Sequence, residues 1–216
     1  MIFINNSDLM GPDWRFVEPL SNDGGIRWEF HHGVPRDAFE RLVRRPNLAR
    51  YRAALSAALS ARRAASAGKD AVLVSHLPRM TAATSLARRA LCSKTPQIAF
   101  AFNFTDLPEG AELAFFRCAL RGVREFVVFS SYERDLYAEL FKIPPEKIRH
   151  LHWAMEPPVP GPVNPLGDPP FEGRPYLCAI GGEGRDYAIL ADAMRRLPDL
   201  PMAIVARPRN VAGLDF

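Results

Sequence analysis

The stretch PYLCAIGGEGRDYAILADAMRRLPDLPMAIVAR, residues 175–207, decides the fold class of this chain. It opens on a short apolar run at 176–180, and a glycine-rich loop follows, with Gly181, Gly182 and Gly184. An amphipathic helical pattern comes next and ends at Pro198, and a second apolar run spans 202–206. A strand, a glycine loop, a helix and a second strand in this order predict a βαβ unit of a parallel sheet.

The glycine loop has two interpretations. Glycines let a backbone approach a ligand closely, and the helix start behind them favours an anion, with Arg185 beside it. Alternatively, the glycines only make a turn, Asp186 caps the helix, and Glu183 repels phosphate. The loop is not the dinucleotide fingerprint, because G-x-G-x-x-G would require a glycine in place of Tyr187. Both interpretations stay open at this point.

Apolar runs alternate with helical patterns through the middle of the chain. We predict parallel strands near 71–75, 97–102, 126–130 and 148–152, with helices between them. This alternation predicts a doubly wound, Rossmann-like α/β domain, and continuous apolar strands fit a sheet that is covered on both faces. Nearer the N-terminus, strands are predicted at 2–4 and 26–31. An alanine-rich helix is predicted at 47–67, with a buried stripe at Leu48, Tyr51, Leu55 and Leu59.

A change in composition marks a domain boundary. Seven prolines lie between Glu156 and Arg174, which is typical of a linker. We therefore expect an N-terminal α/β domain at 1–155, a linker at 156–174, and the start of a second Rossmann-like domain at 175–216. Because one βαβ unit takes roughly 30 residues, we expect that second domain to be incomplete.

Composition is that of a soluble globular protein, with 48% apolar and 24% charged residues among 216. No apolar run is long enough to cross a membrane, and the start MIFINNSD carries no signal peptide, so a cytoplasmic location is expected. The cysteines are few and odd in number, which favours buried thiols of a reducing compartment over disulfides. They are Cys92, Cys118 and Cys178.

Positive charge is concentrated in one region. Residues 36–69 hold nine Arg or Lys against two acids, while the whole chain has a net charge of +4. Such a region fits either peripheral contact with an anionic membrane or a solvated helical face. The modest net charge gives no reason to expect a nucleic-acid partner.

Three stretches resemble parts of family-4-type glycosyltransferases of the GT-B fold. VVFSSYERDLYAELFKIPPEKIRHLHWAMEPP (127–158) resembles the end of their N-terminal domain. RPYLCAIGGEGRDYAILADAMRRLPDLPMAIVA (174–206) is similar to the opening of their nucleotide-sugar domain. AFAFNFTDLP (99–108) resembles the loop after a central strand of the N-terminal domain, where the family often has a histidine and this chain has Asn103. The resemblance covers roughly residues 69–207.

The resemblance implies a glycosyltransferase of glycan or glycolipid synthesis. A nucleotide-sugar donor would lie at Gly181, Gly182, Gly184 and Arg185, and the N-terminal domain would hold an acceptor, which is a glycan, a lipid or a small molecule. No motif calls for a cofactor or a metal. An alternative is a non-catalytic protein that binds a nucleotide or a partner on the same scaffold.

Candidate catalytic residues follow two predicted strands, at the carboxyl ends where open α/β sheets bind ligands. They are His76, Asn103 and Asp106. His76 could contact the acceptor or act as a base, or it could only cap the next helix or bond to the backbone. The carboxylate of Asp106 could accept a hydrogen bond from a sugar hydroxyl, with Asn103 beside it. Both residues also fit an Asx turn that only shapes the loop.

Overall fold

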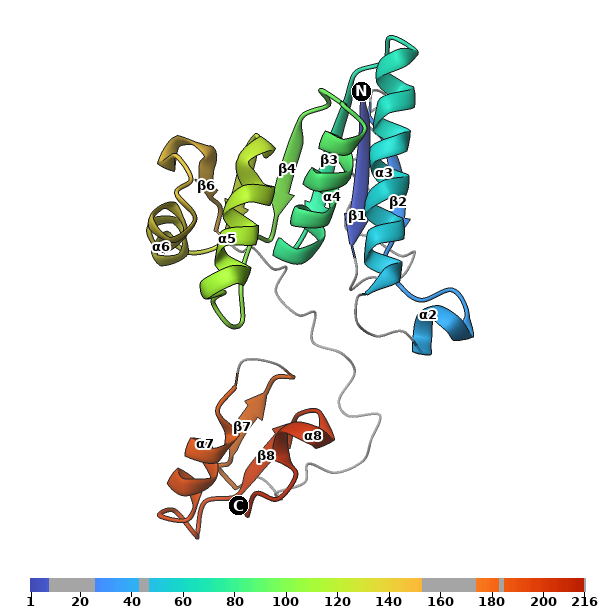
Figure 1. Ribbon diagram of the computed structural model, residues 1–216. Helices are drawn as coiled ribbons and strands as arrows, with labels where there is room; N and C mark the ends of the chain where they lie inside the picture. Colours follow the sequence, from blue (N-terminus) through green and yellow to red (C-terminus); the bar gives the residue numbers. More distant parts are fainter. Residues whose placement is uncertain (8–25, 43–46, 153–173, 183–184, 216) are drawn as a thin grey trace. The chain divides into compact units, whose positions relative to one another are not determined.

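The computed structural model describes residues 1–7, 26–42, 47–152, 174–182 and 185–215. The chain divides into two compact units, residues 1–154 and 155–216, each with its own parallel sheet (Figure 1). We call them unit 1 and unit 2. The predicted linker, 156–174, lies outside the described residues except for Arg174.

Within the described residues of unit 1, six parallel strands form one sheet in the order β2-β1-β3-β4-β5-β6. This confirms the predicted α/β fold and all four strands predicted in the middle of the chain. The order reverses beside β1, since β2 pairs with one of its edges and β3 with the other. The strands are β1 (Ile2–Ser7), β2 (Arg27–His32), β3 (Ala71–His76), β4 (Gln97–Phe100), β5 (Glu125–Val128) and β6 (Ile148–His150).

Helices connect these strands. In Figure 1, α3, α4 and α5 lie over the same face of the sheet. A right-handed crossover explains this arrangement, because each step from β2 to β6 moves across the sheet in one direction. The helices are α2 (Ala38–Leu42), α3 (Leu48–Ser66), α4 (Pro78–Ala90), α5 (Gly110–Ala119) and α6 (Ser131–Phe141), with short 3-10 turns η2 (Leu120–Gly122) and η3 (Pro145–Lys147).

Helix α3 buries a different face from the predicted one. Tyr51 and Leu55 are 48% and 46% exposed, so the leucine and tyrosine stripe is wrong. An alanine face is buried instead, and part of it packs on Ile4 and Leu73 of the sheet. Small side chains let the helix backbone approach the sheet and α4 closely, which is the physical reason for the difference. The buried alanines are Ala49, Ala53, Ala54, Ala57, Ala58, Ala61 and Ala64.

An aromatic cluster fixes the chain just after β4. The fully buried ring of Phe102 makes edge-on contacts with Phe104, Phe126 and Tyr137, with ring centroids 4.9 to 5.6 Å apart. Such pairs are the favoured geometry for aromatic rings. The cluster therefore anchors the segment that leads to Asn103 and Asp106.

A buried polar layer fixes the start of α4 against the sheet. The side-chain amide of Gln97 on β4 donates to Ser75 Oγ and to the carbonyl of Thr81, each at 3.0 Å. Asn6 on β1 donates to Thr84 Oγ1 at 2.6 Å. Because unpaired buried polar groups are costly, these bonds favour one placement of α4 on the strands.

Unit 2 has the βαβ form that the sequence predicts. Its described residues form two parallel strands, β7 (Leu177–Ile180) and β8 (Met202–Val205), paired from Leu177↔Met202 to Ile180↔Val205. Helix α7 (Tyr187–Met194) connects them, and α8 (Pro208–Val211) follows β8. The glycine loop and the residues after β8 consequently lie at the same edge of this sheet.

The cysteines correct one expectation. Cys92, Cys118 and Cys178 are all exposed free thiols rather than buried ones. In the part of the chain that the structure describes, no helix combines the length and the apolar character that a membrane span requires.

Candidate functional site

His76 lies at the carboxyl end of β3, next to the point where the strand order reverses. Its Nδ1 is 3.3 Å from Ser7 Oγ at the end of β1, and its ring stacks on Phe100 with centroids 6.1 Å apart. Open α/β sheets bind ligands in the crevice outside such a switch point. His76 thus lies at the edge where such sheets bind ligands. Its ring also contacts Ser7 and Phe100.

A cavity of about 470 Å³ lies beside this edge of the sheet. It brings together two of the three candidate catalytic residues, Asn103 and Asp106. His76 does not line it, but the next residue, Leu77, does. The lining residues are Arg50, Leu77, Pro78, Arg79, Asn103, Phe104, Thr105 and Asp106. The cavity thus offers an amide, a hydroxyl, a carboxylate and two guanidinium groups for hydrogen bonds.

Two arginines that line this cavity, Arg50 and Arg79, are not among the site residues predicted from the sequence. Arg50 was assigned only to the basic region, and Arg79 was not singled out. Arg79 forms an ion pair with Glu112 on α5 at 2.7 Å. A signal for Arg79 existed, because it comes directly after Pro78, which starts a helix immediately after a predicted strand.

Two backbone positions near the cavity lie in the left-handed region. Leu77, which follows β3, has φ 70° and ψ 155°, and Ala101, which follows β4, has φ 50°. Residues other than glycine adopt such angles only where the surrounding structure holds them. Pro78, directly after Leu77, and Asn103, two residues after Ala101, both line the cavity.

Tyr137 on α6 supports one wall. Its phenol oxygen accepts a hydrogen bond from the Phe104 N–H at 3.0 Å and lies 3.4 Å from Glu133 Oε1. Burial raises the pKa of this phenol to about 12. The neutral phenol consequently holds Phe104, a lining residue, in place.

In unit 2, two arginine side chains lie against the glycine loop. A Cβ added at Gly181 would be 2.7 Å from Arg185 Nε, and one added at Gly182 would be 3.1 Å from Arg207 Nε. A Cβ at Gly181 would therefore displace the flexible Arg185 side chain, and one at Gly182 would require the Arg207 side chain to shift by a few tenths of an ångström. Arg207, at the start of α8, was not predicted. Gly184 lies outside the described residues.

Other contacts fix the shape of the loop. Tyr187 Oη donates to the carbonyl of Gly181 at 2.6 Å, and Asn210 Nδ2 donates to the carbonyl of Gly182 at 2.5 Å. Asp186 caps α7, since its side chain accepts from the Ile189 N–H at 3.0 Å. The helix cap that the turn interpretation predicts is therefore present. The cationic groups beside the loop are Arg185 and Arg207.

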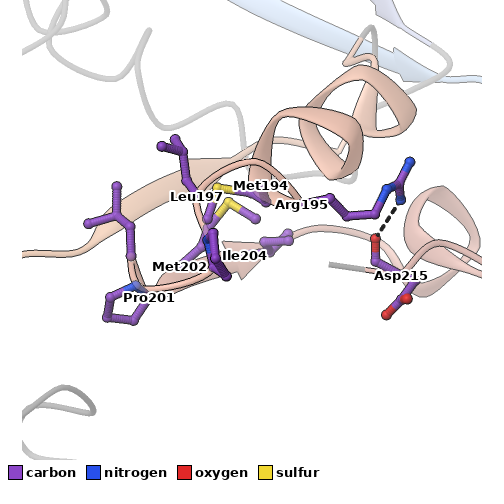
Figure 2. Close-up of a pocket in the computed structure, with 9 residues that line it drawn as sticks. Met194, Arg195, Leu197, Pro201, Met202, Ile204 and Asp215 are labelled. Carbon is purple, nitrogen blue, oxygen red and sulfur yellow. Dashed lines mark hydrogen bonds between the residues drawn. The ribbon is translucent and has the colours of Figure 1, made fainter.

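Unit 2 also has a cavity, of about 490 Å³, which lies at the opposite edge of its sheet from the glycine loop (Figure 2). Its lining is mainly apolar, with Met194, Leu197, Met202 and Ile204. Its arginine is already engaged, because Arg195 donates to the carbonyl of Asp215 at 3.2 Å and pairs with Asp192. Besides the apolar side chains, this cavity therefore offers a ligand mainly the carboxylate of Asp215.

Two further histidines lie close together, with the rings of His150 and His152 4.8 Å apart. Among the residues that the structure describes, no group of three potential metal ligands gathers there or elsewhere. Ser130 caps α6 by accepting from the Glu133 N–H at 3.1 Å, so its hydroxyl has a structural role.

Comparison with known proteins gives structural similarity but no sequence match. No protein-family model matches the chain, and no curated protein matches its sequence. Among solved structures, the crystal structure of Acinetobacter baumannii MurG is similar, with a TM-score of 0.40 and 13% sequence identity. The match covers 95% of this chain and 57% of the MurG chain, so this chain spans little more than half of that protein.

Proposed function

We propose that this protein is a glycosyltransferase of the GT-B type, which transfers a sugar from a nucleotide-sugar donor to an acceptor hydroxyl. Unit 2 would bind the donor and unit 1 the acceptor. The observation that carries the proposal is the pair of arginines, Arg185 and Arg207, against Gly181 and Gly182 at the carboxyl edge of the unit 2 sheet. The sequence resemblance of residues 99–108 and 127–158 described above adds support from outside this loop.

The chemistry of the loop suits a diphosphate. Guanidinium groups form charge-assisted and often bidentate hydrogen bonds with phosphate oxygens. The bare backbone at Gly181 and Gly182 lets a ligand approach the loop closely. When the bond between the sugar and the diphosphate breaks, negative charge grows on the leaving group, and fixed cations stabilise that charge. Arg185 and Arg207 would therefore act mainly on the leaving diphosphate.

The acceptor hydroxyl would lie in the unit 1 cavity. Asp106 would accept a hydrogen bond from it and Asn103 would orient the sugar, with His76 nearby at the end of β3. A transfer with retention needs no strong base, because the leaving diphosphate can itself take the acceptor proton. The proposal requires neither a metal nor a cofactor, and the nucleotide sugar is a substrate.

Calorimetric titration of the 216-residue chain with a nucleoside diphosphate tests the donor site. Arg185→Ala should weaken binding about 10- to 150-fold, which corresponds to the roughly 1.5–3 kcal/mol of a hydrogen bond to a charged group. Arg207→Ala should have an effect of similar size. Arg196→Ala is the matched control, because Arg196 is exposed at the opposite end of α7. Unchanged binding in both loop variants would show that the loop is only a turn.

An activity assay on the same chain distinguishes an enzyme from a non-catalytic binding protein. Release of nucleoside diphosphate from a nucleotide sugar in the presence of an acceptor supports the enzyme. Binding of the nucleotide that depends on Arg185 and Arg207 is expected under both hypotheses, so the release of nucleoside diphosphate is the measurement that separates them.

A further inference from the structure

A second, smaller cavity adjoins the candidate acceptor cavity of unit 1. It measures about 110 Å³ and shares Arg50 and Arg79 with the cavity of about 470 Å³. The two cavities together follow the N-terminal parts of α3, α4 and α5, and we call them the acceptor groove. The smaller cavity is lined by Arg50, Tyr51, Arg79, Ala83, Glu112, Phe115 and Phe116.

The two ends of the acceptor groove differ in chemistry. The larger cavity carries the polar side chains of Asn103, Thr105 and Asp106. The smaller one presents the rings of Tyr51 and Phe115, which are 48% and 43% exposed. An aromatic ring that stays half in water beside a polar cavity gains by being covered with apolar surface. A ligand that fills both ends must therefore be polar at one end and apolar at the other.

Charge along the acceptor groove is balanced. Of its described lining residues, Arg50 and Arg79 are cationic and Asp106 and Glu112 are anionic. The Arg79–Glu112 ion pair at 2.7 Å uses part of that charge. An anionic headgroup would have to compete with the two carboxylates. Hydroxyl groups can donate to carboxylates and accept from guanidinium groups at the same time, so a neutral polyol satisfies both kinds of side chain.

We propose that the acceptor groove binds a neutral glycoside, with its sugar ring in the larger cavity and its apolar aglycone against Tyr51 and Phe115. The larger cavity lies within the range of roughly 300–1,000 Å³ that is usual for small-molecule sites. The inference rests on the proposed function, which it deepens by naming the chemical class of the acceptor.

Titration calorimetry with three probes tests the chemical class. Octyl β-glucoside, kept below its micelle-forming concentration, should bind at least tenfold more tightly than methyl β-glucoside, because only the first covers the aromatic rings. It should also bind more tightly than octyl phosphate, which has the same chain and an anionic head. Equal affinity for the two glucosides would overturn the proposal, and so would tighter binding of octyl phosphate.

Surface variants test the place of binding. Tyr51→Ser and Phe115→Ser should each weaken octyl glucoside binding at least fivefold and leave methyl glucoside binding unchanged. Asp106→Asn should weaken both. Tyr132→Ser is the matched control, since Tyr132 is a 73% exposed tyrosine on α6 that lines neither cavity. An equal loss in the control would mean general adhesion to exposed rings and would refute the groove.

One further titration separates this inference from the proposed function. Arg185→Ala, in unit 2, should leave octyl glucoside binding unchanged. If the parent chain binds octyl glucoside at the groove but no nucleoside diphosphate, the glycoside site stands and the donor proposal fails. If it binds the nucleotide and no glucoside, the donor proposal stands and the glycoside site is refuted.

Discussion

The buried phenol of Tyr137 should make the stability of the fold depend on pH. Burial raises the pKa of its phenol from an ordinary value near 10 to about 12. The neutral phenol is thus favoured in the folded state, and its contribution to stability is complete below pH 10 and is lost as the pH rises through 12. We expect the free energy of unfolding to fall between pH 10 and 12.

Tyr137→Phe tests this assignment. The variant should lose about 1–3 kcal/mol at neutral pH, because the Phe104 N–H keeps no acceptor for its hydrogen bond. It should also show a flatter decrease of stability between pH 10 and 12 than the parent. Urea unfolding at several pH values measures both effects, and parallel curves for parent and variant would assign the alkaline loss to other groups.

Arg207 is a residue beside the glycine loop that the sequence alone did not predict. The glycines and Arg185 were found because they follow one strand directly in the sequence. Arg207 follows the next strand, and only the pairing of Ile180 with Val205 brings its segment to the same edge. That contact follows from the parallel register, and the rule that ligands bind at the carboxyl edge could have pointed to it.

Helix α3 shows the limit of hydrophobic periodicity at the element scale. The pattern favoured burial of the largest apolar side chains, whereas the structure buries alanines and leaves Leu55 46% exposed. Periodicity reports which faces are apolar, but the distance between the packed backbones decides which face fits. The strands were easier to predict, because a run such as 71–74 is continuously apolar and contains two β-branched valines.

Paired substitutions in α3 test its alanine face. Ala57→Leu should destabilise unit 1 by about 1–3 kcal/mol, because Ala57 is fully buried against Ile4 and Leu73 and the added volume forces a shift. Leu55→Ala on the exposed face should change stability by about 0.5 kcal/mol or less. Thermal unfolding of both variants is the measurement. A greater loss of stability in Leu55→Ala than in Ala57→Leu would show that the leucine face of α3, rather than the alanine face, is buried.

At the scale of the whole molecule, the basic region remains a proposal for membrane contact. Part of it has a structural role, since Arg52 forms two hydrogen bonds with the Glu40 carboxylate, at 2.8 and 3.2 Å. Arg62 and Arg63 near the end of α3 are exposed. They are thus available to an anionic surface, at about 1 kcal/mol for each cationic side chain close to it.

Vesicle sedimentation tests this proposal. The chain should bind vesicles that contain anionic lipid, and binding should fall steeply with salt, because the Debye length is only about 10 Å at 0.1 M. The double variant Arg62→Glu and Arg63→Glu should bind much less than the parent. Equal binding to neutral and anionic vesicles would assign the region to an ordinary solvated surface.

The left-handed backbone at Ala101 implies a trade-off between stability and the proposed ligand binding of unit 1. A residue other than glycine costs about 1–2 kcal/mol in the left-handed region. Glycine relieves that cost but adds roughly 0.4–1 kcal/mol of chain entropy to the unfolded state. Ala101→Gly should therefore raise the free energy of unfolding, as measured in urea, by less than about 1 kcal/mol, because it also removes the buried methyl of Ala101.

The same variant should bind an acceptor less well, since a freer chain before Asn103 and Asp106 must be ordered when the ligand binds. Titration with octyl β-glucoside alongside urea unfolding gives both quantities on one protein. A more stable variant with weaker binding would mean that selection for activity, rather than for stability, keeps an alanine at this position, and that glycine is the substitution to try first when unit 1 is to be made more heat-resistant.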